Sequence, residues 1–390
     1  MRYFSQCYNR AMEASQPLEL DLARQEKAKE YARIRRRLFV INLAWNGAYA
    51  IAWLLFGWAS GLRNSLLSFT ANPWLLVPAF ISLYGGISSI LTSPLSYYSG
   101  FILPHRYGLS NQTLRDWLLD RLKSLGISAS LGLVIIEMVY WVLRAYPETW
   151  WLWVAGILLL FNVVLANLFP ILIAPLFNKY VPLDEEHTEL ADRLLKLATQ
   201  ANTTVRGVYK FDMSRRTKAA NAALTGIGNS RRIILGDTLI DEFETEEIET
   251  ILAHELGHHI HKDIPVGMII SSIITLLGLY LASAGLRWGV NYLGFSSIAD
   301  VAAFPLFGLM VGLFSLVSMP LGNAYSRWRE RRADAYAIAA TGNPRAYAAA
   351  MTRLANQNLA DVDPDPWVEF MLHSHPALRK RIQMAEEYQV

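Results

Sequence analysis

Cysteine is almost absent from this sequence of 390 residues, which contains a single one, Cys7. One thiol excludes an intrachain disulfide and any metal site built on several cysteines. Charged side chains are also scarce, at 18% of the residues, against about 25% in an average soluble domain. No cleavable signal peptide is expected from residues 1–37, because they carry many charges and no apolar core. The small net charge of +3 gives no indication of a nucleic-acid partner.

The apolar residues gather in six long runs instead. Each run is close to the roughly 20 residues that a helix needs to cross a bilayer. Tryptophan and tyrosine cluster near the ends of the runs, as in the interfacial belts of membrane proteins. The sequence therefore predicts a mainly α, polytopic membrane protein with about six transmembrane helices, at residues 38–60, 73–92, 125–146, 150–176, 263–287 and 301–322.

Lysine and arginine are distributed unevenly over the segments between these runs. The loops after the first, third and fifth runs hold only Arg63, whereas all other segments are rich in cations. Because basic loops stay in the cytoplasm, both termini are predicted to be cytoplasmic. We divide the chain into a cytoplasmic N-terminal segment (1–37), a first membrane part (38–177) with a cytoplasmic loop at 93–124, a soluble α+β segment (178–262), a second membrane part (263–322) and a C-terminal helical segment (323–390).

Residues 178–262 have the composition of a soluble domain. Residues 182–200 show the spacing of an amphipathic helix, and residues 205–212 favour a strand. Residues 219–236 predict a β-hairpin with its turn at 228–230. Thr245 is a candidate cap for a further helix that runs to about Lys262.

The motif His-Glu-Leu-Gly-His occupies residues 254–258 of that last helix. Two histidines four residues apart share one helix face, so His254 and His258 can bind the same metal ion. Glu255 is then placed to take a proton from a water molecule at the metal, which is the arrangement of a zinc peptidase. The motif also arises by chance, and a surface helix with two histidines would look the same, so other residues must decide.

A catalytic zinc needs three protein ligands and one open position. Glu330, which follows the last apolar run, is the candidate third ligand. Asp334 lies one helical turn further on the same face and could accept a hydrogen bond from a ligating histidine, fixing its tautomer. The arginines of this segment are interpreted as a solvated or headgroup-facing surface: Arg327, Arg329, Arg331 and Arg332.

With these residues assembled, the chain resembles the integral-membrane CAAX prenyl proteases, zinc endopeptidases that cleave prenylated CaaX-type proteins and peptides. The resemblance runs from about Glu26 to the C-terminus and includes the zinc motif at 254–258. Other matching segments are Asn323 with Ser326-Arg327, Glu330 and Ala333-Asp334; Ser374-His375-Pro376 followed by Arg381; Ser96-Tyr97-Tyr98; Gln112-Thr113-Leu114; Asn221-Ala222; and Arg232 to Leu239.

The resemblance implies one zinc ion per chain, a ring of membrane helices around a large water-filled chamber, and a small α+β zinc-metalloprotease domain at its cytosolic end. Glu255 would be the general base and then the proton donor. The implied zinc ligands are His254, His258 and Glu330. The residues that would steady the oxyanion are His375 and Arg381, and those that would bind substrate are Asn221, Ala222 and Asn323.

Eukaryotic members carry an additional N-terminal span, so this chain is expected to be a prokaryotic-type member. The expected location is the cytoplasmic membrane in a prokaryote or the endoplasmic reticulum in a eukaryote, with the catalytic site toward the cytoplasm. The expected partners are a peptide or protein substrate, with or without a prenylated C-terminal CaaX tail, and membrane lipid. The remaining histidines are interpreted as surface or supporting residues: His105, His187, His259, His261 and His373.

Three other interpretations remain open at this stage. A heat-shock-type quality-control zinc protease would carry the same histidine motif, but it would differ in the number of spans and in the loop at 93–124. A non-catalytic membrane scaffold would have no need of the complete set of ligand and catalytic residues. A zinc transporter would place its polar ligands inside the spans, whereas the cluster here lies at the span ends.

Overall fold

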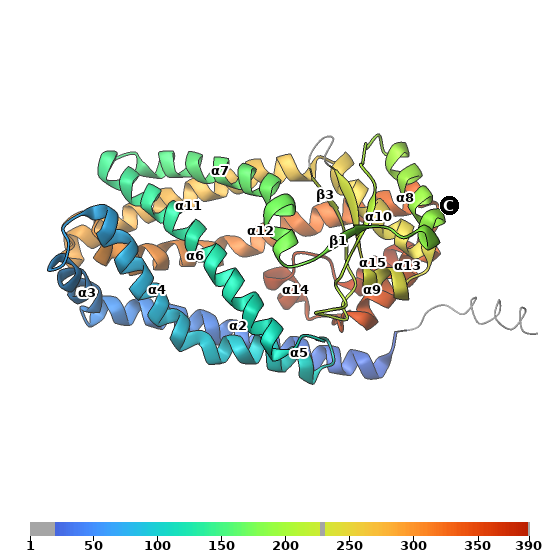
Figure 1. The fold of residues 1–390 in the computed structure, drawn as a ribbon, viewed down its shortest axis with the longest axis horizontal. Helices are drawn as coiled ribbons and strands as arrows, with labels where there is room; N and C mark the ends of the chain where they lie inside the picture. The colour runs from blue at the N-terminus through green and yellow to red at the C-terminus, as the bar shows by residue number, and fades with distance from the viewer. Residues whose placement is uncertain (1–19, 227–230, 389–390) are drawn as a thin grey trace, which may run out of the picture.

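The computed structural model describes residues 20–226 and 231–388, which are mainly helical (Figure 1). Within these residues, 6 helices are long and apolar enough to cross a membrane, as the six apolar runs predict. They are α2 (Leu22–Leu55), α4 (Pro73–Tyr97, continued by η1, Tyr98–Ile102, and α5, Leu103–Arg106), α6 (Leu114–Ala145), α7 (Trp150–Leu168), α11 (Asp263–Leu293) and α12 (Phe304–Thr341).

Two of these helices extend far beyond their apolar runs. α2 begins at Leu22, where Asp21 caps it, so the basic residues before the first span belong to the same helix. α12 continues past the last span without a break until Gly342, whose φ of 60° ends it. Asn343 then caps α13 (Pro344–Gln357), accepting the Ala346 amide. The continuous α12 carries Glu330 rigidly on the helix that also spans the membrane.

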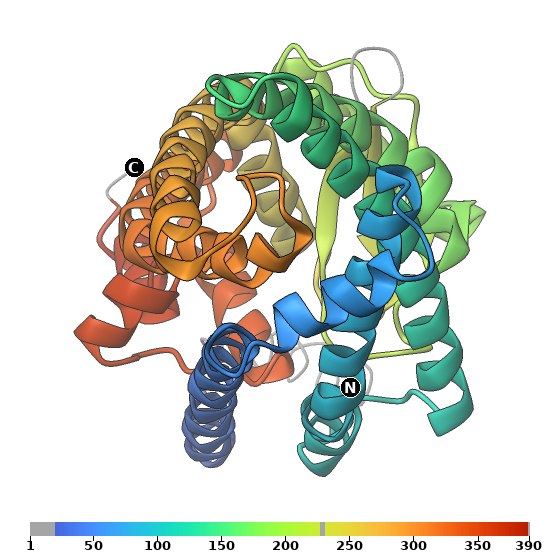
Figure 2. The same cartoon turned by 90° about the vertical axis from the view of Figure 1, so that its left-hand side faces the viewer.

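The spanning helices form a ring when the molecule is viewed along its long axis (Figure 2). Only 6% to 28% of the residues in the most apolar stretch of each helix are buried within the protein. Such shallow contact fits a ring of helices around a chamber, and a tightly packed bundle would bury more. The inner faces meet at one end, where Trp53, Phe80 and Trp150 belong to a common core with Leu286 and Leu306.

Two short elements close this same end of the ring. α3 (Trp58–Leu67) contacts α4 and η6 (Val301–Ala303). Arg63 of α3 forms an ion pair with Asp300, whose carboxylate also accepts hydrogen bonds from the Ser296 and Ala302 amides. The ring is therefore closed at the end away from the soluble part of the molecule.

The soluble part contains a four-stranded sheet with the order β1-β2-β4-β3. The strands are β1 (Tyr180–Pro182), β2 (Val208–Phe211), β3 (Ala222–Thr225) and β4 (Arg232–Gly236). β2 and β4 are parallel, and the other neighbours are antiparallel. The predicted hairpin is present as β3 and β4, with Ala222 opposite Leu235, while its predicted turn at 228–230 lies outside the residues described.

Helices cover this sheet and form the core that positions the site. They are η4 (Glu185–His187), α8 (Thr188–Gln200), α9 (Asp237–Glu242), α10 (Thr245–Ile260), α13 and α15 (Leu378–Glu386). α14 (Pro366–Leu372) packs against α12 instead. Leu194, Ile233, Leu252 and Tyr347 come from four different elements and are all fully buried in one cluster. The predicted helix at 182–200 begins late, at Thr188, because residues 180–182 pair with β2 instead.

The cap of α10 differs from the prediction. Thr245 is the first helical residue, and Glu244 is the N-cap. The Glu244 carboxylate accepts the Glu247 amide, and the Glu247 carboxylate accepts the Glu244 amide at 3.0 Å. This reciprocal pair satisfies two helix-end amides and places negative charge at the positive end of the helix dipole, which a single hydroxyl cannot do.

Candidate metal centre

α10 and α12 approach each other closely at Gly257, the fourth residue of the histidine motif. A Cβ atom at this position would lie 3.0 Å from the Cα atom of Ala333 and 3.2 Å from its carbonyl oxygen. Both are backbone atoms, which cannot move aside as a flexible side chain can. Glycine therefore allows the contact that brings Glu330 to the histidine pair.

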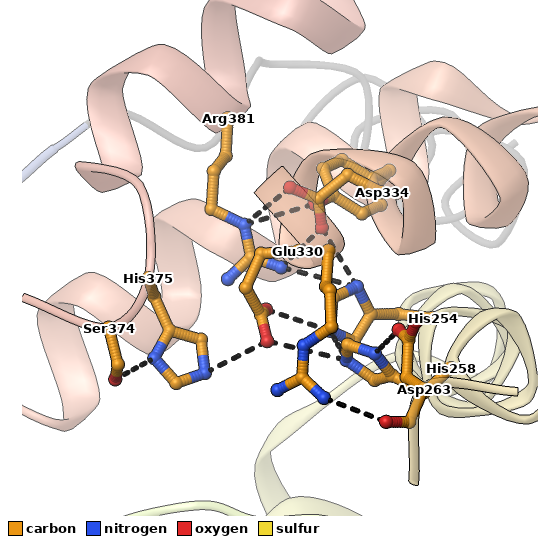
Figure 3. Close-up of polar contacts among 10 residues, drawn as sticks. His254, His258, Asp263, Glu330, Asp334, Ser374, His375 and Arg381 are labelled. Atoms are coloured by element: carbon orange, nitrogen blue, oxygen red, sulfur yellow. Dashed lines mark hydrogen bonds and ion pairs between the residues drawn. The ribbon is translucent and has the colours of Figure 1, made fainter. Parts of the chain in front are cut away.

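The ligand atoms of His254, His258 and Glu330 converge on one point (Figure 3). The two Nε2 atoms are 3.2 Å apart, His254 Nε2 lies 3.2 Å from Glu330 Oε2, and His258 Nε2 lies 3.4 Å from Glu330 Oε1. Ligands about 2.0–2.1 Å from a tetrahedral zinc are about 3.3 Å from one another. The three side chains thus already have the spacing of a zinc coordination shell.

Carboxylates hold both histidine rings from behind. Asp334 Oδ1 lies 2.8 Å from His254 Nδ1, as the spacing on α12 predicts, and Asp263 Oδ2 lies 2.8 Å from His258 Nδ1. Because a carboxylate can only accept a hydrogen bond, each Nδ1 carries the proton and each Nε2 directs a lone pair at the centre. The sequence interpretation missed Asp263; its position five residues after His258, at the start of the next helix, was the available signal.

The centre contains acceptors without a donor. Glu330 is 4% exposed, and its Oε2 atom is buried with no hydrogen-bond partner. A buried carboxylate oxygen facing two imidazole lone pairs is costly unless a cation or a proton lies between them. The residues therefore fit a metal ion with two nitrogen ligands and one oxygen ligand.

When no metal ion is bound, a proton on the histidines supplies part of the positive charge that the buried Glu330 carboxylate requires. Burial alone would lower the pKa of His254, but the hydrogen bonds to Asp334 and Glu330 outweigh burial and raise it to about 9. Burial likewise opposes protonation of His258, and its contacts with Glu330 and Asp263 raise its pKa as well. The site thus attracts positive charge strongly.

Glu255 lies between the two ligands and is half-buried. None of the residues that the structure describes forms a hydrogen bond or an ion pair with its carboxylate. Burial raises its pKa, and the neighbouring histidines oppose that effect only in part. A raised pKa and unused acceptor atoms suit this carboxylate to accept a proton from a neighbouring water.

His375 reaches the site from the segment between α14 and α15. Its Nε2 atom lies 3.4 Å from Glu330 Oε1, and its Nδ1 atom lies 3.0 Å from Ser374 Oγ. The side chain is 60% exposed, so it borders the open side of the centre. The structure therefore brings His375 to the ligands, as the sequence prediction requires.

Arg381 lies behind the centre. Its Nε and Nη2 atoms bind the two carboxylate oxygens of Asp334 at 3.0 and 2.5 Å, and Nη2 is 3.4 Å from His254 Nδ1. Tyr347 holds the same guanidinium through its hydroxyl. Two of the three guanidinium nitrogens thus hold Asp334, and Asp334 in turn holds His254. The sequence did not indicate this positioning role for Arg381.

The three predicted substrate-binding residues lie at different places. Ala222 begins β3, an edge strand of the sheet that pairs with β4. The backbone carbonyl of Asn221 accepts a hydrogen bond from the Gly236 amide. β3 also contacts α10, the helix that carries the histidine motif. Asn323 donates its side-chain amide to the Met371 carbonyl at 2.7 Å, so it connects α12 to α14.

The surface interpretation of the arginines is wrong for two of them. Arg329 has a buried Nε atom, and its Nη1 atom donates to the Asp263 carbonyl at 3.1 Å. Arg327 is 8% exposed, and its Nη1 atom donates to the carbonyls of Glu369 and His373 at 2.9 and 2.6 Å. It binds the C-terminal end of α14 because unpaired helix-end carbonyls attract a cation. Arg331 is exposed and Arg332 lies over the Trp328 ring, so these two agree with a surface location.

The other histidines lie in different surroundings. Within the described parts of the chain, the one His, Asp and Glu group with metal-ligand spacing is that of His254, His258 and Glu330. His105 contacts the carbonyls of Phe101 and Gln112, and His261 lies edge-on to Tyr336.

The comparisons with known proteins agree with this geometry. Residues 7–179 match the family model "CAAX prenyl protease N-terminal, five membrane helices", and residues 184–389 match "Peptidase family M48". "Uncharacterized metalloprotease YhfN" of Bacillus subtilis is 30% identical over 364 residues, which cover 92% of this chain and 85% of the relative. CAAX prenyl protease 1 of Saccharomyces cerevisiae is 28% identical over 392 residues, with 93% and 86% coverage.

A solved structure shares the whole fold. The crystal structure of S. mikatae Ste24p has a TM-score of 0.85 and 25% sequence identity, and the match covers 95% of this chain and 90% of that chain. Together with the two family models, this match favours the enzyme interpretation over a scaffold or a transporter. The chain belongs to peptidase family M48 and is a membrane metallopeptidase of the CAAX prenyl protease type.

Proposed function

We propose that this protein is a zinc endopeptidase that cleaves peptide or protein substrates at the cytoplasmic face of a membrane. The observation that carries the proposal is the convergence of two imidazole nitrogens and one buried carboxylate, 3.2 to 3.4 Å apart, with no donor between them. Two histidines, one glutamate and an open fourth position form the ligand set typical of catalytic zinc.

The division of labour among the side chains follows from their surroundings. His254, His258 and Glu330 would hold the zinc ion, which would supply Lewis acidity and lower the pKa of a water at its open position. Glu255 accepts the proton of the attacking water and then delivers it to the leaving amine. His375 borders the open side, and its Nε2–H is placed to donate to the oxyanion. Arg381 supports the centre through Asp334 and adds positive charge behind it.

The edge of the sheet offers a place for the substrate backbone. β3 has a neighbour on one side only, and it lies against the helix of the histidine motif. An extended peptide that pairs with Asn221 and Ala222 would gain main-chain hydrogen bonds without strict side-chain selection. An apolar substrate tail would then lie within the ring of helices.

The substrate class is proposed to be peptides with a prenylated C-terminal CaaX tail. The relatives named CAAX prenyl protease support this, as does a helix ring with shallow internal contacts that could hold a lipid tail. The distribution of lysine and arginine supports a cytoplasmic site, in the cytoplasmic membrane of a prokaryote or the endoplasmic reticulum of a eukaryote.

The test compares the purified protein with its Glu255→Gln variant on farnesylated and unfarnesylated CaaX peptides. Loss of the base is expected to lower the rate by about 10²–10⁴-fold, with zinc content unchanged because Glu255 is not a ligand. Glu249→Gln, on the same helix but away from the metal, is the matched control and should keep wild-type activity.

Chelator should abolish cleavage by the wild type, and added zinc should restore it. A Glu255→Gln variant that still hydrolyses peptides normally would exclude this residue as the base. Equal cleavage of both peptides would replace the prenylated substrate class by general peptide hydrolysis. Absence of zinc from the active wild-type protein would contradict the proposed metal.

A further inference from the structure

α14 presents two large aromatic side chains to its surroundings. Trp367 is 68% exposed and Phe370 is 45% exposed, and their ring centroids are 6.3 Å apart. Glu369, between them in sequence, points inward and is 6% exposed. An exposed aromatic pair on a helix whose opposite side is buried marks a binding surface.

α14 lies at the level where α12 leaves the membrane. Asn323, the first residue after the last apolar run, binds the Met371 carbonyl of α14 at 2.7 Å. Just before it, Leu321 is 71% exposed, as expected of a lipid-facing side chain. Just after it, Tyr325 and Trp328 stack with centroids 5.8 Å apart, a pair typical of the membrane interface.

The basic residues of α2, which lie just outside the first span, also indicate where the membrane surface is. Arg36, two residues before the first apolar run, is half-buried on α2, which packs against α12. Arg33 and Arg37 are exposed on the same helix. A basic segment just outside a span attracts anionic lipid headgroups. α14 packs against α12, the helix that carries this end of the last span.

We propose that α14 is an interfacial helix whose Trp367 and Phe370 insert into the cytoplasm-facing leaflet of a bilayer with anionic headgroups. The exposed rings, the end of the α12 span and the basic residues of α2 all lie at this one level. Indole and phenyl rings are favoured at the boundary between headgroups and acyl chains. A bilayer thereby covers a surface that would be unfavourable in water.

The inserted helix is connected to the proposed oxyanion donor. Arg327, one turn before Glu330, donates to the carbonyls of Glu369, Phe370 and His373. On the other side of the same segment, the Glu369 carboxylate accepts the Ala377 amide at 3.1 Å and the Lys380 ammonium at 2.6 Å. Residues 373–377 are thus held at both ends by α14, and His375 lies in the middle. Contact with the bilayer would fix the position of His375 beside Glu330, a consequence that rests on the proposed function.

The depth of α14 can be measured with a nitroxide spin label. Cys7 is replaced by serine, which leaves no other cysteine, and Phe370→Cys is labelled in protein reconstituted into vesicles with anionic lipid. The label is expected to collide readily with oxygen, which concentrates in lipid, and poorly with a water-soluble nickel chelate. Lys196→Cys, on the exposed face of α8, is the matched control and should show the opposite ratio. Equal nickel accessibility at both positions would overturn the proposal and leave the aromatic pair as a surface for a soluble partner.

The connection to His375 is tested with a Trp367→Ser/Phe370→Ser variant and an unprenylated soluble peptide. In vesicles, kcat/KM is expected to fall about tenfold, or about 1.4 kcal/mol in barrier height, with zinc content unchanged. In detergent, where no bilayer is present, the difference from wild type should be smaller. An equal loss of kcat/KM in vesicles and in detergent would mean that the substitutions act on folding, and it would overturn the proposed link between bilayer contact and His375. If the wild type cleaves no peptide at all, the proposed function fails, and the label still decides the membrane contact.

Discussion

At the scale of single residues, the metal centre depends on carboxylates that do not touch the metal position. Asp334 and Asp263 each hold one histidine by its Nδ1 atom, and Arg381 holds Asp334 in turn. Asp263 is 3% exposed and begins α11 directly after Lys262, which has a positive φ of 56°. The sharp turn at Lys262 directs the Asp263 side chain back to His258.

Removing the charge of Asp263 is expected to weaken zinc binding. In Asp263→Asn the amide can present its nitrogen to His258, which favours the wrong tautomer, and partners of this kind contribute about 10–100-fold to metal affinity. Competition with a fluorescent chelator measures the change. Asp192→Asn, on the exposed face of α8, should bind zinc like the wild type. Unchanged affinity in Asp263→Asn would mean that His258 needs no such support.

Zinc binding is also expected to depend on pH. His254 has a pKa raised to about 9 in the metal-free geometry, so its ring carries an extra proton below that pH. Zinc binds the neutral imidazole and must displace this proton. Apparent zinc affinity should therefore rise by up to about tenfold per pH unit as the pH approaches 9, and then level off. An affinity that stays constant from neutral pH to 9 would contradict this protonation state.

At the scale of secondary-structure elements, the contact between α10 and α12 decides the geometry of the site. α10 supplies two ligands and α12 the third, and the two helices touch where Gly257 faces Ala333. The capping box at Glu244 and the ion pair of Glu247 with Arg353 hold the other end of α10. The ligand helix is thus fixed at both ends.

A methyl group at position 257 should separate the two helices. In Gly257→Ala the new Cβ atom would meet backbone atoms of Ala333 at 3.0 and 3.2 Å, and such overpacking costs about 1–3 kcal/mol. We expect a lower zinc content and a lower temperature of unfolding. Gly156→Ala in α7, where no atom lies within 4 Å of the added carbon, is the control and should behave like wild type. Full zinc occupancy in Gly257→Ala would show that the contact can relax.

At the scale of the whole molecule, six spanning helices carry a soluble unit at one end of their ring and a closed cap at the other. The loops at the capped end are short and contain few cations. The soluble unit, the start of α2 and the helices that follow α12 lie at the opposite, basic end (Figure 1). The fold therefore joins a lipid-facing exterior to a metal centre at the membrane surface.

Reactive cysteines can verify the orientation. In the Cys7→Ser background, Ser68→Cys at the capped end should react with a membrane-impermeant thiol reagent added outside intact cells. Lys196→Cys in the soluble unit should react only after the membrane is permeabilised, because the basic loops stay in the cytoplasm. The reverse pattern would place the metal centre outside the cytoplasm.

Much of this organisation can be predicted from the sequence, because it depends on local patterns. An apolar run reports a membrane span, and two histidines four residues apart necessarily share one helix face. The six helices, the β3–β4 hairpin and the position of His254 and His258 on one helix are of this kind. The third ligand needed the family resemblance, since spacing alone left Glu330 as one candidate.

Only the tertiary structure decided which distant residues meet. The burial of Arg327 against α14 and the attachment of Arg381 to Asp334 join segments whose sequences carry no sign of one another. The sequence does not distinguish a carboxylate or a guanidinium that is surrounded by water from one that binds a helix end. Its partner is determined by the packing of α10, α12 and α14, and that packing is a property of the folded chain as a whole.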